Sequence, residues 1–312
     1  MMKGIRIVAT GSALPEKVIT NDDLSRLVDT NDEWITTRTG IKQRYQCGQE
    51  TCVSLAVQAA EEAVSRAGID RAEIGVVLVA TQTPDYIFPS AACLVQKELG
   101  LSEEVMAFDI GAACTGFLMG LGTARALLEA SPKPYALVIG SEQLSKIIDY
   151  TDRSTCILFG DGAAAVVIES ADKSFRQKSW ARGNREVLSC LGPGNANAKL
   201  QMLGSEVFRF AVTALAQAIE EVLGEEGITM AEVDYCICHQ ANARIISHVM
   251  KKYPGFEDKF YMNIEKYGNT SAASIPLVLD ELFREGKLRS GSRVICVGFG
   301  AGLTWSGLYM EV

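Results

Sequence analysis

The chain has 312 residues, and its 48% hydrophobic and 22% charged residues are ordinary for a globular protein with a substantial core. A formal net charge of −8 argues against nucleic acid as a general partner. No apolar run in the sequence reaches the ~18 residues of a membrane span, so we expect no membrane partner.

The cysteines and the N-terminal segment indicate a compartment. Nine cysteines without paired spacing are typical of reduced thiols rather than of a disulfide framework. Residues 1–17 enter a strand-like alternation and lack an apolar signal segment, so we expect a cytoplasmic protein. Cys236 and Cys238 share one strand face, but there is no second cysteine pair and there are only two histidines, so we expect no metal site.

Strands and helices alternate through the first 170 residues. Residues 4–13 are predicted as a strand, and polar clusters at 21–23 and 30–32 predict the starts of two short helices. An amphipathic helix is expected from Thr51 to Ala67, before Gly68. The other elements predicted in this part are strands at 75–81, 105–110, 135–140 and 159–169 and a helix at 91–99. The apolar strands, including 105–110, are expected to be buried in a sheet covered on both faces.

The second part begins after a polar segment at 171–200, which we interpret as an irregular connector with some strand. The elements predicted beyond it are helices at 205–223 and 241–252 and strands at 235–238, 293–297 and 304–310.

The second part repeats the first. The segment VVLVATQ aligns with DYCICHQ, and FDIGAACTGFL aligns with KYGNTSAASIPL. Thr81 precedes Cys114 by 33 positions, and His239 precedes Ser271 by 32. The near-equal spacing predicts an α/β fold with duplicated halves, 1–170 and 171–312. Sites in such folds lie where strand ends from both halves converge.

Cys114 follows a predicted strand and a turn of small residues, and a helical pattern begins at once after it. The unpaired backbone N–H groups and the positive dipole at a helix start depress a cysteine pKa and favour the nucleophilic thiolate. The alternative is a buried structural thiol.

His239 and Asn269 are predicted to converge on Cys114. His239 ends a strand at the position that matches Thr81, and Asn269 lies in the turn that matches residues 112–114. The alternatives are a satisfied structural histidine and a helix N-cap asparagine. Together the three residues suit acyl chemistry: a thiolate takes the acyl group. The other two then donate hydrogen bonds to the enolate oxygen formed when a β-carboxylate is lost.

Seven motifs in order carry a resemblance that runs almost end to end. They are DEWITTRTGI (32–41), FPSAAC (88–93), AACTGF (112–117), TDRSTCILFGDGAAA (151–165), HQAN (239–242), GNTSAAS (268–274) and GFGAGLTW (298–305). The sequence resembles the β-ketoacyl-acyl carrier protein synthase III family of the thiolase-like superfamily. The resemblance implies a five-layered α-β-α-β-α arrangement.

The resemblance also implies catalytic roles. Cys114 matches the nucleophile, His239 and Asn269 match the decarboxylation pair, and the backbone N–H groups of Cys114 and Gly302 match an oxyanion hole. Ala301 stands where the family often has glycine, so the backbone geometry before Gly302 is a point for the structure to test.

Further matches concern binding. Trp34, Arg38 and Arg153 match positions that hold the coenzyme A nucleotide. Phe88 matches a residue at the active-site contact between the two subunits of a homodimer.

The implied reaction is a condensation in two half-reactions. An acyl group passes from acyl-coenzyme A to Cys114, and malonyl-acyl carrier protein then loses carbon dioxide and attacks it, as the first step of type II fatty-acid synthesis. The coenzyme A thioester is a substrate, and no cofactor or metal is expected. Two alternatives remain: a polyketide or other secondary-metabolite condensing enzyme of this fold, and a non-catalytic paralogue that binds coenzyme A or carrier protein. Which acyl primer is preferred stays open.

A basic helix is the predicted docking surface for the carrier. Arg244, His248, Lys251 and Lys252 follow HQAN with spacings of four, seven and eight residues, which places them on one helix face beside His239. A local basic patch offsets the repulsion between an acidic enzyme and an acidic carrier protein. The alternative is an ordinary solvated face, and Lys259 is expected to extend the patch.

Overall fold

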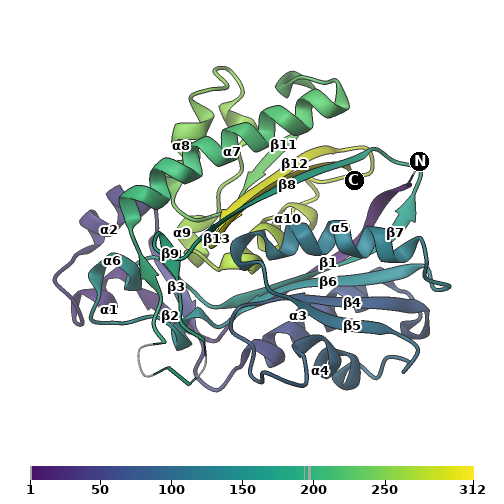
Figure 1. Cartoon of the computed structure of the whole chain (residues 1–312), viewed down its shortest axis with the longest axis horizontal. Coiled ribbons are helices and arrows are strands. Elements are labelled where there is room, and N and C mark those ends of the chain that lie inside the picture. Colours follow the sequence, from purple (N-terminus) through teal and green to yellow (C-terminus); the bar gives the residue numbers. More distant parts are fainter. Residues whose placement is uncertain (1, 193, 196–197) are drawn as a thin grey trace.

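Two β-sheets form the centre of the computed structural model, which describes residues 2–192, 194–195 and 198–312 (Figure 1). The first sheet has the order β1-β7-β6-β4-β5. Its strands are β1 (Gly4–Ala13), β4 (Ile74–Ala80), β5 (Met106–Ile110), β6 (Tyr135–Glu142) and β7 (Gly162–Ala171). The second sheet has the order β11-β12-β13-β8. Its strands are β8 (Phe175–Asn184), β11 (Tyr235–Cys238), β12 (Arg293–Gly300) and β13 (Gly302–Glu311).

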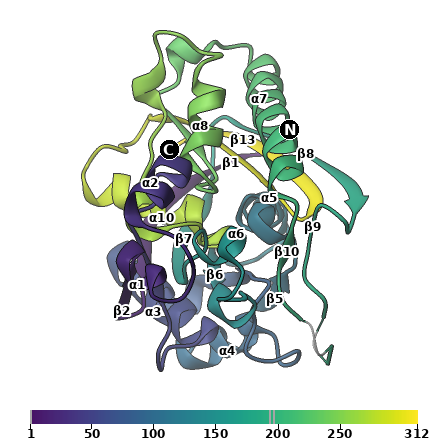
Figure 2. The same ribbon diagram turned by 90° about the vertical axis from the view of Figure 1, so that its left-hand side faces the viewer.

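Helices fill three layers around these sheets. Two pack between the sheets, α5 (Gly116–Leu128) and α10 (Ser274–Arg284). The outer face of the first sheet is covered by α3 (Cys52–Ala67) and α4 (Ala91–Glu98), and that of the second by α7 (Gly204–Glu226) and α8 (Ala243–Met250). Figures 1 and 2 show the resulting α-β-α-β-α stack, which confirms the predicted fold class.

The all-apolar sequence of β4 follows from this layering. Val76 and Leu78 point into the core that contains α5, whereas Val77 and Val79 point into the core that contains α3. Because successive side chains leave opposite faces of a strand, a strand covered on both sides needs apolar residues at every position.

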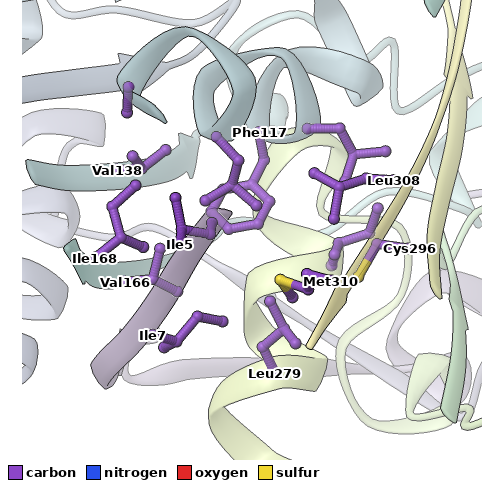
Figure 3. Close-up of a cluster of buried hydrophobic side chains, with 14 of the residues drawn as sticks. Ile5, Ile7, Phe117, Val138, Val166, Ile168, Leu279, Cys296, Leu308 and Met310 are labelled. Carbon is purple, nitrogen blue, oxygen red and sulfur yellow. The ribbon is translucent and has the colours of Figure 1, made fainter. Parts of the chain in front are cut away.

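The central core joins the two sheets through the helices between them (Figure 3). Phe117 from α5 and Leu279 from α10 are fully buried, and they pack with Val138 of the first sheet and Leu308 of the second. Rigid packing of this layer fixes the start of α5, where Cys114 lies, relative to the start of α10, near Asn269.

Two non-glycine residues with positive φ lie at matching positions of the two halves. Ala113 has φ 46° and Ser271 has φ 49°. Thr81 precedes Ala113 by 32 positions and His239 precedes Ser271 by 32, so Ser271 matches Ala113 and not Cys114, a correction of one residue. We propose the division into halves at 170/171, because β7 of the first sheet ends at Ala171 and β8 of the second begins at Phe175.

One prediction about a single element is wrong. The strand at 105–110 is not buried, because β5 is the edge strand of its sheet and Met106 and Phe108 are each 39% exposed. The segment 171–200 is a connector with some strand, as predicted, and its main strand is β8, ten residues paired along β13. Its polar sequence reflects exposure at the edge of the second sheet.

A small unit lies beside the strand ends of the first sheet. It contains β2 (Lys17–Thr20), β3 (Gln43–Gln46), α1 (Asn21–Ser25), α2 (Asp32–Thr39), α6 (Arg153–Cys156) and α9 (Ile264–Tyr267). The helix starts predicted at 21–23 and 30–32 are present, although Thr20 rather than Asn21 caps α1, and Asn31 caps α2. Buried Ile35, Ile41 and Ile157 hold the unit together and present Trp34 at its surface.

The remaining elements are short. They are β9 (Leu188–Ser189), β10 (Gln201–Met202) and the 3-10 turns at 71–73, 113–115, 144–146, 230–232, 257–259 and 271–273. Within the described residues, no helix has both the length and the apolar character needed to cross a membrane.

Leu308→Ala tests the central core. Truncation of this fully buried side chain should lower the free energy of unfolding by about 2–5 kcal/mol, because transfer and cavity costs add. The matched control is Leu27→Ala, at a side chain that is 59% exposed, which should change it by less than about 0.5 kcal/mol. Urea unfolding at one protein concentration measures both, and equal losses would contradict the assigned core.

Candidate active site

One large cavity lies where strand ends of the two halves meet. Its volume is about 1660 Å³, and its lining includes Cys114, His239 and Asn269 together. The loop that carries Cys114 belongs to the first half, and the other two side chains belong to the second. The convergence predicted from the duplicated strand ends is therefore present.

Cys114 lies in a 3-10 turn directly before α5, so the predicted helix-start position is present. The prediction that this position depresses its pKa is wrong: burial raises the pKa of the Cys114 thiol to about 12, and the Glu142 charge adds to the rise. The Ser271 side chain lowers this pKa in part. The resting group at pH 7 is a neutral thiol.

His239 follows β11 and is 1% exposed. Its Nδ1 lies 2.6 Å from Ser274 Oγ, which also accepts the Gln240 N–H at 3.4 Å. The Ser274 proton is thus free to be donated to Nδ1, which leaves Nε2 as the protonated nitrogen for the cavity. Burial lowers the pKa of His239 to about 3, so the ring is a neutral donor at pH 7.

Asn269 precedes the 3-10 turn that leads into α10. Its backbone N–H donates to Leu158 O at 2.8 Å, and its carbonyl accepts from Gly160 N at 3.0 Å, so the peptide is held on both sides. The side-chain Oδ1 accepts the Ser271 N–H at 2.9 Å. With its oxygen engaged, the amide has its Nδ2 donor group left for the cavity that it lines.

The glycine-rich segment after β12 lies against Cys114. A Cβ atom on Gly300 would stand 2.9 Å from Cys114 N, so no side chain fits there. Gly302 lines the cavity and has φ 142°, a conformation that glycine adopts readily. Ala301 is accommodated, since its carbonyl accepts the Thr304 hydroxyl at 3.2 Å in the turn between β12 and β13.

Trp34 and two arginines form a stack at the cavity mouth. The guanidinium carbons of Arg38 and Arg153 lie 4.8 and 4.7 Å from the indole centroid, within cation–π range. Trp34 and Arg38 line the cavity, whereas Arg153 is not part of the lining and donates to Asp29 O at 2.7 Å. The three predicted nucleotide-binding residues are therefore adjacent.

The basic helix is shorter than predicted, because α8 ends at Met250. Arg244 lines the main cavity and shares a second, smaller groove with His248 and Lys251, but Lys252 lies beyond the helix and outside both. The expected basic face therefore holds for Arg244, His248 and the C-cap residue Lys251, and not for Lys252.

Lys259 does not extend the basic patch, which corrects that expectation. Its Nζ donates to the carbonyl oxygens of Met230 and Ala231 at 2.8 and 2.7 Å, and to that of Val233. The side chain therefore fastens the turn at 230–232 to the turn at 257–259.

Metal ligands do not gather at this site. In the part of the chain that the structure describes, His, Cys, Asp and Glu form no group of three or more that could hold a metal ion. Cys236 and Cys238 are both buried.

Known proteins match the chain along nearly its whole length. The family description "3-Oxoacyl-[acyl-carrier-protein (ACP)] synthase III" matches residues 108–181, and its C-terminal counterpart matches residues 223–312. A β-ketoacyl-[acyl-carrier-protein] synthase III from Clostridium acetobutylicum is 42% identical over 99% of both chains, and one from Clostridium botulinum is 44% identical over 98% of both. The chain belongs to the 3-oxoacyl-[acyl-carrier-protein] synthase III family.

Solved structures agree with this family membership. The 3-oxoacyl-[acyl-carrier-protein] synthase III of Aquifex aeolicus has a TM-score of 0.94 at 42% identity and covers 99% of this chain and 100% of its own. The priming β-ketosynthase of the R1128 polyketide pathway has a TM-score of 0.93 at 33% identity, with 100% and 97% covered.

Phe88, the residue predicted to reach a second subunit, points away from this cavity. It is 84% exposed and is absent from the cavity lining, although its neighbours Tyr86 and Ile87 line it. The loop at 86–88 and the edge strand β5 each expose apolar side chains on the surface of this synthase III chain.

Four residues of this synthase III site were missed by the sequence analysis. Ser274 contacts His239, and Gly300 lies against Cys114. Ser271 donates a hydrogen bond to Glu142 at 2.9 Å beside Cys114. A usable signal existed for Glu142, because it ends the apolar strand YALVIGSE at the edge where the other site residues follow their strands.

Proposed function

We propose that this chain condenses an acyl-coenzyme A primer with malonyl-acyl carrier protein to give β-ketoacyl-acyl carrier protein, the initiating step of type II fatty-acid synthesis. The observation that carries the proposal is that the Cys114 turn shares one cavity with a neutral His239 and the amide of Asn269. Membership of the synthase III family supports it, and makes the chain an acyltransferase-type condensing enzyme.

The first half-reaction is acyl transfer to Cys114. The sulfur attacks the thioester carbonyl, the carbon–sulfur bond to coenzyme A breaks, and the thiol proton leaves with the coenzyme A thiolate. The backbone N–H groups of Cys114 and Gly302 stabilise the oxyanion in this proposal. Gly300, without a side chain, leaves the space that brings this loop against Cys114.

The second half-reaction is decarboxylation followed by carbon–carbon bond formation. The bond to the malonyl carboxylate breaks, carbon dioxide leaves, and the electron pair forms an enolate. Its oxygen accepts hydrogen bonds from His239 Nε2 and Asn269 Nδ2, both neutral donors already oriented by Ser274 and Ser271. The carbanion carbon then attacks the acyl group and releases the Cys114 thiolate, which regains a proton.

This chemistry uses no resident cofactor. The departing carboxylate supplies the electron pair, and hydrogen bonds supply the stabilisation of charge, so each step balances with the two thioester substrates alone. We propose that the Trp34 indole and the Arg38 and Arg153 guanidinium groups bind the adenine ring and phosphates of coenzyme A.

A homodimer is the proposed assembly, and the cytoplasm is the proposed location. Edge strand β5 exposes Met106 and Phe108, and the neighbouring loop exposes Ile87 and Phe88, so an apolar surface lies beside an unpaired strand edge. A second copy that covers it would satisfy that edge and bring Phe88 toward the partner's cavity.

Priming of a polyketide pathway is the second candidate function. The R1128 priming ketosynthase shares the fold at a TM-score of 0.93, but its identity of 33% is below the 42–44% of the synthase III relatives. The higher identity favours the fatty-acid reaction.

Cys114→Ser tests the nucleophile. The hydroxyl oxygen is a far weaker nucleophile than sulfur, so covalent labelling by radiolabelled acetyl-coenzyme A should disappear. Cys93→Ser is the matched control, because this exposed cysteine lies outside the cavity and its loss should leave labelling intact. Persistent labelling of the Cys114 variant would place the nucleophile elsewhere.

His239→Ala and Asn269→Ala test the enolate donors. Each variant should still acylate Cys114, whereas release of carbon dioxide from malonyl-carrier protein should fall by about 100-fold or more, since one donor to a developing oxyanion contributes about 3–4 kcal/mol. Acylation and decarboxylation are measured separately. A variant that decarboxylates at the wild-type rate would refute its assigned role.

Arg244→Glu tests carrier docking. The apparent KM for malonyl-carrier protein should rise several-fold while acylation by acyl-coenzyme A stays near the wild-type rate, and added salt should weaken the wild-type reaction with carrier. The control is Lys97→Glu on α4, the helix on the opposite outer layer, with a side chain 76% exposed. Equal slowing of both half-reactions would make Arg244 a structural residue.

A further inference from the structure

Glu142 is a buried acid that the mechanism above does not use. We propose that Glu142 is a positioning residue: through Ser271 it holds the Asn269 amide in place for decarboxylation. This inference rests on the proposed function and concerns its second half-reaction.

The carboxyl group of Glu142 accepts every hydrogen bond around it. The side chain is 0% exposed at the end of β6, and its Oε2 accepts from Gln82 N at 3.0 Å and from Thr83 Oγ1 at 2.8 Å. Thr83 Oγ1 itself accepts the Gln143 N–H at 2.7 Å, so its own proton points to Glu142. These donors lower the pKa of Glu142 in part, but burial is the larger effect and raises it.

The other carboxyl oxygen controls the turn that carries Asn269. Glu142 Oε1 accepts from Ser271 Oγ at 2.9 Å, and the Ser271 N–H donates to Asn269 Oδ1 at 2.9 Å. Ser271 has φ 49°, in the left-handed region, which surrounding contacts must hold. A chain of two hydrogen bonds therefore runs from Glu142 to the amide that is proposed to donate to the enolate.

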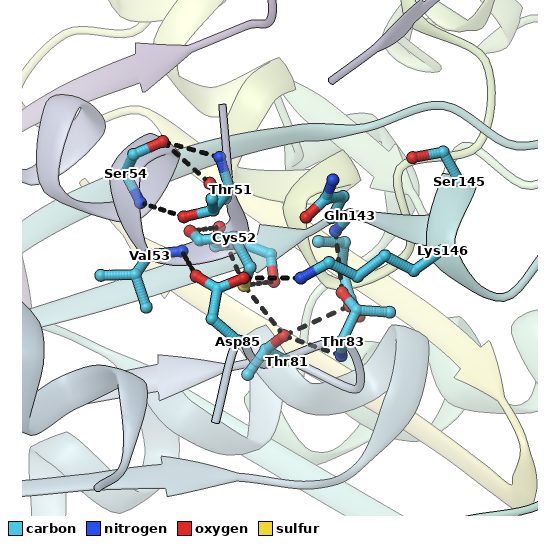
Figure 4. A network of polar contacts seen from close by, with 12 residues as sticks. Thr51, Cys52, Val53, Ser54, Thr81, Thr83, Asp85, Gln143, Ser145 and Lys146 are labelled. Carbon is cyan, nitrogen blue, oxygen red and sulfur yellow. Dashed lines mark hydrogen bonds and ion pairs between the residues drawn. The ribbon is translucent and has the colours of Figure 1, made fainter. Parts of the chain in front are cut away.

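The hydrogen bonds of Glu142 continue on its other side into the first half. Thr81 Oγ1 lies 3.4 Å from Glu142 Oε2 and 3.3 Å from Cys52 Sγ, and the Thr83 N–H donates to Thr81 Oγ1 at 3.1 Å (Figure 4). Glu142 therefore connects the loop after β4 to the turn that carries Ser271.

The duplication shows that the acid is specific to one half. Gly140 and Gly298 each follow their positive-φ residue by 27 positions, and two positions further on stand Glu142 and Gly300. In the second half this position is Gly300, because a side chain there would clash with the Cys114 turn. In the first half it is Glu142, whose carboxyl group is hydrogen-bonded to Ser271 in the turn after Asn269. Packing alone therefore does not require an acid at this position.

Glu142→Ala and Glu142→Gln separate this proposal from a merely structural role. Alanine removes the hydrogen bond to Ser271, so decarboxylation of malonyl-carrier protein should fall about tenfold while acylation of Cys114 by acetyl-coenzyme A stays near the wild-type rate. Glutamine keeps an acceptor for Gln82 and Thr83 and turns its NH₂ toward Ser271 Oγ, so it should restore most of the decarboxylation rate.

Ser271→Ala is the third variant, and Ala113 at the matching position shows that alanine adopts this backbone conformation. It breaks the same hydrogen-bond chain and should reduce decarboxylation several-fold. Undiminished decarboxylation in Glu142→Ala or Ser271→Ala, or an equal loss of both half-reactions in Glu142→Ala, would overturn the proposal. Absence of decarboxylation in the wild type would instead refute the proposed function.

Discussion

The contact between two left-handed turns is the constraint on which the site depends. The turn at Ala113 carries Cys114, the turn at Ser271 follows Asn269, and the two turns meet between the sheets. Each turn lies against a glycine of a neighbouring strand, where no side chain would fit. A Cβ on Gly140 would stand 2.3 Å from Ala272 O, and one on Gly300 would stand 2.9 Å from Cys114 N. Both helices of the middle layer start from these turns, so the packing of Phe117 and Leu279 also fixes the reacting groups.

Burial at this meeting point decides the protonation states. It holds Cys114 as a thiol and His239 as a neutral ring, since a low-dielectric environment disfavours the charged form of each group. A neutral imidazole with Nδ1 bonded to Ser274 is a suitable donor to an enolate, and it needs no change of charge during decarboxylation. In the proposed mechanism, the site therefore stabilises negative charge with oriented dipoles rather than with a formal cation.

Much of the fold and the catalytic constellation could be predicted from the sequence, because periodicity and strand-end position are local properties. The apolar strand 75–81 predicted a sheet covered on both faces, and His239 and Cys114 could be placed at converging strand ends. The edge position of β5 was missed, because strand order depends on pairing between distant segments; the aspartate in MAFDI, which the central strand IGVVLVA lacks, was the one available signal. The acid Glu142 was missed because its partner Ser271 is 129 positions away in sequence.

The prediction of a depressed pKa for Cys114 was wrong for a related reason. The sequence shows the helix start that favours thiolate, but it does not show how completely the neighbouring layers exclude water, and desolvation is the larger effect here. The sequence also did not show that α8 ends at Met250, before Lys252, or that Lys259 is held by backbone carbonyl groups of the turn at 230–232.

The proposed docking residue is tied to His239 by a short segment held by hydrogen bonds. The His239 N–H donates to Val297 O at 2.8 Å and completes the last parallel pair of β11 and β12, Cys238–Val297. Three residues later, Asn242 caps α8, and its side-chain oxygen accepts the Arg244 N–H at 2.8 Å. The position of Arg244 relative to His239 therefore follows from these hydrogen bonds. In the proposed function, a carrier protein bound at Arg244 lies beside the cavity that His239 and Asn269 line, so one hydrogen-bonded segment joins docking to the second half-reaction.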